Sequence, residues 1–225
     1  MKVSTHSLLF IVLVMFTQSA AAQDSSAYRL YPPELNDTVS LYIQRLRAGI
    51  TDSVIRFDVP AYHKSELPTP DDFPHSNIYP NTSYIFYRSG YKTYVVKYEW
   101  WGMEDGKSRH YFYTPTYLPE DTLFDWFARH AADLRQDYIG KFMAKDTLNN
   151  SIRYQSWHPL YSAVYRISFY TPDDKTSHYI NSEDLLKQNH RGMININYEY
   201  NTSKKIFTFF LMLEQQCLEL FSPHR

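Results

Sequence analysis

Residues 83–113 read SYIFYRSGYKTYVVKYEWWGMEDGKSRHYFY and carry the strongest structural signal in the chain. Aromatic and β-branched residues, which fit the pleated surface of a sheet, are frequent along this stretch. Two turn signals, Ser89-Gly90 and Asp105-Gly106, divide it into three strands. No helix-length segment separates these strands, so the sequence predicts consecutive antiparallel hairpins rather than a parallel sheet.

Helices are expected on both sides of these hairpins. Residues 34–49 show one apolar stripe at helical spacing, formed by Leu35, Val39, Tyr42, Ile43 and Leu46. Residues 119–140 predict a second helix, with a proline at its start and a glycine at its end. A short third helix is expected from Ser182 to residue 189.

Further strands complete the predicted sheet. Residues 54–59 (VIRFDV) alternate as a strand does, and residues 160–170 are expected to pair with residues 151–156. A last hairpin is predicted from residues 194–200 and 205–213. The expected fold class is α+β: a mainly antiparallel, hairpin-rich sheet of about eight strands, with two longer helices and one short helix packed against it.

The first 22 residues are predicted to be a secretory signal peptide. Lys2 precedes an apolar run at residues 8–16, and small residues follow up to Ala22. Such a run suits a signal peptide and is too short for a bilayer, which takes about 20 residues. A retained membrane anchor is the alternative. We expect residues 23–33 to be a flexible lead, and residues 34–225 to form a single α+β domain with a proline-rich loop at 60–82 and no transmembrane segment after cleavage.

Charge and cysteine content narrow the possible classes of protein. Lys and Arg number 23 against 24 Asp and Glu, which argues against a nucleic-acid binder because phosphates require a basic excess. The single cysteine, Cys217, excludes an internal disulfide, and its apolar neighbours predict a buried, unreactive thiol. Together with the signal peptide, this favours an exported bacterial protein, either periplasmic or extracellular.

A candidate ligand site follows from the Asp105-Gly106 turn. A two-residue loop there pairs Trp101 with His110 and places Glu99 on the same face of the sheet. An aromatic ring beside a carboxylate and an imidazole is suited to binding a glycan or a peptide. Glu99 and His110 are also the best available pair for acid–base catalysis. The alternative is a solvated or loop-covered face, since a register slip of one residue disperses the three side chains.

No metal site and no cofactor is predicted. The polar residues of the proline-rich loop do not have the spacing of a metal site and are expected to be solvated: His63, Asp71, Asp72 and His75. The sequence contains no G-x-S-x-G, H-E-x-x-H, C-x-x-C or Walker motif. The acidic pairs at residues 120–121 and 183–184 fall at predicted helix starts, where the helix dipole favours negative charge.

These observations favour an exported, non-enzymatic binding or interaction domain whose ligand is a glycan, a peptide or another protein. Two alternatives remain open: an exported hydrolase acting on cell-envelope or polymeric material, and a structural or assembly subunit. Most of the tyrosines are expected to pack in the core. A surplus exposed on one face would indicate a partner surface.

Overall fold

The computed structural model describes residues 33–60, 81–102, 108–119, 122–146, 151–153, 163–188 and 192–221. The predicted signal peptide, residues 23–32 and residues 61–80 lie outside this described part, and so do the loop residues His63, Asp71, Asp72 and His75. The chain divides into two compact units, residues 1–40 and 41–225. The described part of the first unit is the beginning of helix α2 (Pro33–Gly49), which continues into the second unit.

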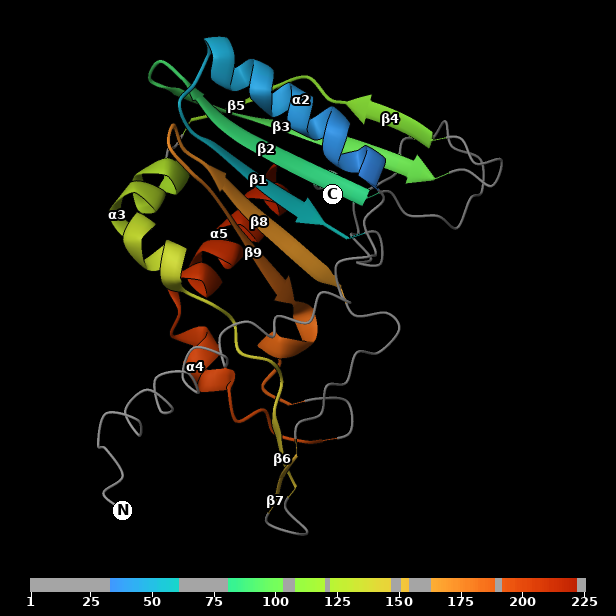
Figure 1. Cartoon of the computed structure of the whole chain (residues 1–225), viewed down its shortest axis with the longest axis vertical. Helices are drawn as coiled ribbons and strands as arrows, with labels where there is room; N and C mark the ends of the chain where they lie inside the picture. The colour runs from blue at the N-terminus through green and yellow to red at the C-terminus, as the bar shows by residue number, and fades with distance from the viewer. Residues whose placement is uncertain are drawn as a thin grey trace, which may run out of the picture. The chain divides into compact units, whose positions relative to one another are not determined.

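The second unit is built on a seven-stranded antiparallel sheet (Figure 1). Its strand order is β4-β3-β2-β1-β8-β9, and β5 also pairs with β3. The strands are β1 (Val54–Val59), β2 (Asn81–Ser89), β3 (Lys92–Gly102), β4 (Ser108–Phe112), β5 (Thr116–Leu118), β8 (Val164–Tyr170) and β9 (Lys175–Asn181). A separate two-stranded ladder joins β6 (Ala144–Asp146) to β7 (Ser151–Arg153). The predicted α+β class with a mainly antiparallel sheet is confirmed.

Helices α3 (Thr122–Gln136) and α5 (Lys205–Phe221) pack on one face of the sheet, here called the core face (Figure 1). Two short helices, η2 (Ser182–Leu185) and α4 (Tyr198–Thr202), precede α5. The predicted hairpin over residues 194–213 is therefore wrong. Five buried residues of α5 recur at helical spacing, so α5 turns one continuous apolar stripe toward the sheet: Ile206, Phe209, Phe210, Leu213 and Cys217.

The strands around β8 also pair differently from the prediction. Residues 151–153 form β7 and pair with β6, whereas β8 lies between β1 and β9. Tyr165, Ile167 and Phe169 share one face of β8 and all belong to the buried core. β8 is thus an inner strand of the sheet, and β9 forms the edge beyond it.

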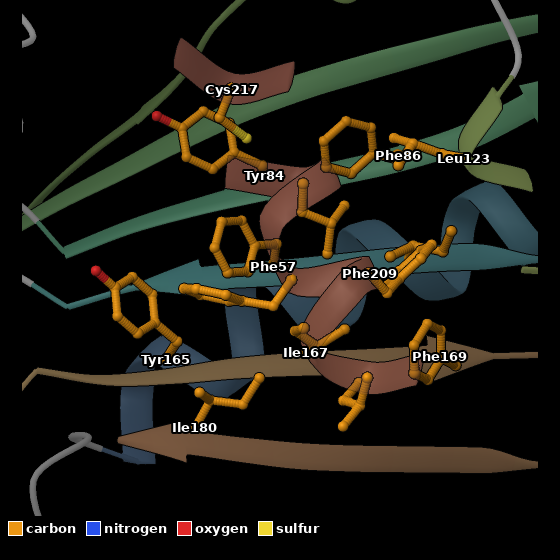
Figure 2. Packing of buried hydrophobic residues seen from close by; sticks show 14 of the residues in the cluster. Phe57, Tyr84, Phe86, Leu123, Tyr165, Ile167, Phe169, Ile180, Phe209 and Cys217 are labelled. Atoms are coloured by element: carbon orange, nitrogen blue, oxygen red, sulfur yellow. The ribbon is translucent and has the colours of Figure 1, made fainter. Parts of the chain in front are cut away.

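Aromatic side chains dominate the core between the sheet and α5 (Figure 2). The ring of Phe57 lies 5.9 Å from those of Tyr165 and Phe210, and Phe209 lies 5.4 Å from Phe169. Burying one such side chain stabilises a fold by about 1.5–3 kcal/mol. Cys217 lies in this cluster beside Tyr84 in Figure 2, and burial raises the pKa of its thiol well above the ordinary value. The prediction of a buried cysteine is confirmed.

Candidate functional site

The structure places two of the predicted site residues, Glu99 and His110, on opposite faces of the sheet. β3 pairs with β4 so that Trp100 lies opposite His110, and Glu99 lies opposite Tyr111. The predicted pairing of Trp101 with His110 is wrong by one residue. Because successive side chains of a strand point to opposite faces, this shift separates Glu99 from His110. The side chain of Trp101 and residues 103–107 lie outside the described part of the chain.

In both hairpins the loop differs from the predicted one, and this changes which residues of the two strands pair. A two-residue loop at Asp105-Gly106 requires pairing up to residues 104 and 107, but the described ladder ends at Gly102 opposite Ser108. In the preceding hairpin Ser89 pairs with Lys92, so Gly90 and Tyr91 form the loop instead of Ser89 and Gly90. Gly90 takes a φ of 61°, which glycine adopts without strain and which two-residue hairpin loops require.

Glu99 lies on the core face, in a buried ion pair. Its Oε1 is 2.5 Å from Lys97 Nζ, and its Oε2 accepts a hydrogen bond of 2.7 Å from the Tyr113 hydroxyl. Both charged side chains are only 6% exposed. Burial and the neighbouring carboxylate raise the pKa of Tyr113, which keeps the hydroxyl protonated as a donor. The geometry makes Glu99 part of a closed network inside the fold.

His110 stands on the second face of the sheet and is exposed. Its Nδ1 contacts the hydroxyl of the buried Tyr98, and its ring lies 6.5 Å from that of Trp100. The aromatic neighbours of His110 thus include Tyr98 and Trp100, and the tryptophan opposite it in the ladder is Trp100, the residue before the one predicted. The proposed acid–base pair with Glu99 does not form, because Glu99 lies on the other face of the sheet.

A buried network of charged and polar side chains lies on this second face, around Asp58. Its Oδ1 accepts from Arg56 Nε at 2.7 Å and from the Ser83 hydroxyl at 2.5 Å, and its Oδ2 accepts from Arg166 Nε at 2.6 Å. All four residues are buried. Burial raises the pKa of Asp58, but the charges of Arg56 and Arg166 outweigh that effect and hold the pKa below its ordinary value.

The chemistry of the Asp58 network follows from this charge balance. A carboxylate stabilised by two guanidinium groups is a poor proton acceptor, so it does not activate the Ser83 hydroxyl as a nucleophile. The cross-strand geometry matches a structural role: Asp58 pairs with Ser83 on one side and with Arg166 on the other. The network therefore fastens β1 to its two neighbours.

A groove of about 710 Å³ opens at the opposite end of β1. It is lined by the end of α2, the following turn, the β2–β3 hairpin and the first turns of α3. The lining residues are Arg47, Ala48, Gly49, Ile50, Thr51, Asp52, Ser53, Arg88, Gly90, Phe124, Phe127 and Ala128. A Cβ atom placed on Gly49 or Gly90 would meet nothing within 4 Å, so these two positions border open space.

The charged side chains of the groove are held in place by its walls. Arg88 lies over the Phe124 ring, 5.3 Å from its centroid, and its Nη2 is 2.6 Å from Asp125 Oδ1. Arg47 Nη2 donates to the Thr171 carbonyl oxygen at 2.6 Å, at the turn between β8 and β9. Positioned groups lose less conformational entropy on binding than free side chains do.

The aromatic side chains of the groove are anchored as well. Phe127 stacks on Phe169 of the core, with ring centroids 4.8 Å apart. Phe124 is buried, whereas Ile50 is half exposed on the groove wall. The groove therefore combines two oriented guanidinium groups, the carboxylate of Asp52 and an anchored apolar wall.

Sequence reasoning missed this groove because its parts are distant in the chain. Arg47 lies in the last turn of α2, Arg88 near the end of β2, and Phe124 in the first turn of α3. None of these positions forms a motif with another. The available signal was topological, since consecutive antiparallel elements bring their turns together at one end of a sheet.

A rigid loop platform, formed by residues 139–144, 183–188 and 193–202, presents another accessible surface. The amide side chain of the buried Asn201 bonds both backbone groups of Gly140 and the Asp184 carbonyl oxygen, each at 2.8 Å. Buried Asn195 likewise bonds the backbone of Met143, Asp184 and Leu186. Three apolar side chains of the platform are exposed: Leu186, Ile194 and Ile196.

Neither a metal centre nor a family assignment emerges. Among the described residues, no three His, Cys, Asp or Glu side chains are grouped as metal ligands. No helix in the same residues is long and apolar enough to cross a membrane. Comparison of the chain with protein-family models, curated proteins and solved structures finds no match. Function is therefore argued from the groove and the surface.

Proposed function

We propose that this chain is an exported, non-enzymatic domain that binds a ligand in the groove of Arg47, Arg88, Phe124 and Phe127. The observation that carries the proposal is the convergence of two guanidinium groups and an anchored apolar wall on an open hollow of about 710 Å³. A hollow of this size suits a small ligand or a few residues of a chain. The predicted signal peptide supports export to the periplasm or the cell exterior.

Binding is favoured over catalysis by where the reactive groups lie. Asp58, Glu99 and Cys217 are buried within the fold, away from the groove lining. In the groove the hydroxyl of Thr51 donates to the Ser53 carbonyl oxygen at 3.0 Å, which is a local turn interaction. The hydrolase hypothesis relied on Glu99 and His110 together, and these residues occupy opposite faces of the sheet.

A ligand screen by thermal shift tests the proposal. The exported chain is heated with divalent metals, oligosaccharides, envelope fragments and peptides, because a ligand that binds only the folded state raises Tm. We expect one class to raise Tm in the natural chain and not in Arg47→Gln or Arg88→Gln. Arg129→Gln is the matched control, since Arg129 is an exposed α3 residue outside the groove lining. An equal rise in all four proteins would place the ligand elsewhere.

The exposure of Leu186, Ile194 and Ile196 on the loop platform favours a second candidate, an assembly subunit. Ile194 and Ile196 flank the buried Asn195 and are 56% and 40% exposed. Rigid exposed apolar residues are typical of protein interfaces. Light scattering during gel filtration tests this reading: an oligomer in the natural chain and a monomer in Ile194→Ser would support assembly, and a monomeric natural chain would contradict self-assembly.

A further inference from the structure

We infer that the ligand of the groove carries a single carboxylate group next to an apolar group, an inference that rests on the proposed function. Arg47 and Arg88 supply guanidinium groups, whose planar forks bind carboxylates through paired hydrogen bonds. In the described part of the chain, the hydrogen bonds of Arg47 involve Nη2 and the carbonyl oxygens of Thr171 and Pro172. Its remaining N–H groups are the donors assigned to the ligand.

The charge balance of the site favours a monoanion over a phosphate group. Asp125 neutralises part of the Arg88 charge at 2.6 Å, and Asp52 lines the same groove. These carboxylates offset part of the positive charge of the groove, which favours a ligand with one negative charge over a dianion. A carboxylate carries one negative charge and fits the fork of a guanidinium that is already oriented by its stacking on Phe124.

The apolar wall specifies the rest of the ligand. Ile50 is 50% exposed beside Ala48, Phe124, Phe127 and Ala128, so the groove presents apolar surface close to the two guanidinium groups. An aliphatic or aromatic group placed there would lose contact with water while its carboxylate stays paired. The C-terminal residue of a peptide and a short fatty acid share this chemistry, and both are tested below.

Calorimetric titration of the full exported chain with matched probes tests the inference. The probes are the tripeptide Ac-Ala-Leu-Phe with a free carboxyl end, the same peptide with an amide end, octanoate and inorganic phosphate. We expect the acid peptide or octanoate to bind, and the amide and phosphate to bind about tenfold to a hundredfold more weakly, because hydrogen bonds to charged groups are lost. Binding of the acid peptide alone identifies a peptide source, and binding of octanoate alone identifies a fatty-acid source.

Variants distinguish two claims: that the ligand binds in the groove, and that its carboxylate is recognised there. Arg88→Gln should weaken the carboxylate probe about tenfold or more, and Arg88→Lys should recover only part of the loss because it keeps the charge without the fork. Both variants must unfold at the temperature of the Arg129→Gln control. If the acid peptide and the amide peptide bind with equal affinity, and Phe124→Leu weakens both, the carboxylate inference is overturned and the groove remains the binding site. Binding unchanged in every groove variant would overturn both, and absence of binding by all probes would overturn the carboxylate inference.

Discussion

The same chemical group, an arginine guanidinium, does different work at the two ends of β1. Arg56 and Arg166 are buried against Asp58, whereas Arg88 is 38% exposed over Phe124 and contributes to the groove with Arg47. In the buried network every charge is needed to compensate another, because removal from water is costly. In the groove each guanidinium remains accessible to water and hence to a ligand. The degree of burial thus distinguishes arginines that stabilise the fold from arginines that are accessible to a ligand.

The sharpest test of the buried side of this comparison is Asp58→Asn. Loss of the carboxylate removes the buried counter-charge that Arg56 and Arg166 share, so we expect the free energy of unfolding to fall by about 3–5 kcal/mol. Urea denaturation followed by circular dichroism measures it. The matched control is Asp125→Asn, which removes the exposed partner of Arg88 and should cost about 0–1 kcal/mol. Similar losses in both variants would contradict the distinction.

Asn201→Ala extends the comparison to an uncharged group. The buried amide of Asn201 bonds Gly140 N–H, the Gly140 carbonyl and the Asp184 carbonyl, so its removal leaves buried backbone groups unpaired. We expect a loss of about 1–3 kcal/mol by urea denaturation. Asn197→Ala is the control, because the Asn197 side chain donates its bond to Lys141 at an exposed position and should cost less. A larger loss in Asn197→Ala would contradict the role given to burial.

The pH dependence of the free energy of unfolding tests His178, a partly buried ionisable residue on the core face. Burial lowers the pKa of His178 below its ordinary value of 6.5, although Asp137 acts in the opposite direction. As pH falls below about 6.5, the unfolded chain binds a proton before the folded chain does, so stability should decrease. His178→Gln should reduce this decrease between pH 7 and pH 5, measured as the urea midpoint. An unchanged pH profile in the variant would assign the effect to other groups.

The smallest expected effect on stability belongs to the groove. Arg88→Gln should change the free energy of unfolding by about 0–1 kcal/mol, since its ion pair with Asp125 is exposed. Its ligand affinity should nevertheless fall about tenfold or more. Thermal unfolding and calorimetric titration on one preparation give both quantities. A large loss of stability would place Arg88 with the buried arginines and break the comparison.

Local pattern predicted the strands well but could not predict their register or the groove. Residues 54–59 and the stretch that contains residues 164–170 are predicted as strands and both lie in the sheet, although nearly every position of β1 and β8 is buried, so their burial does not alternate. The pairing of β3 with β4 depends on where each hairpin turns, so one residue decided whether Glu99 met His110. Residues 205–213 are predicted as a strand because phenylalanine and isoleucine are frequent in strands, but the spacing of Ile206, Phe209 and Leu213 is helical and the segment forms α5.

The most direct test of ligand binding in the groove is the ¹H–¹⁵N spectrum of the natural chain, recorded with and without the probe that raises Tm most in the screen. We predict that the amide signals of Gly49, Gly90 and Ala128 shift most, because these residues line the groove. The amides of Glu99 and His110 should remain unchanged. Shifts concentrated at Glu99 and His110, with the groove amides unmoved, would contradict the account and return the binding site to the β3–β4 hairpin.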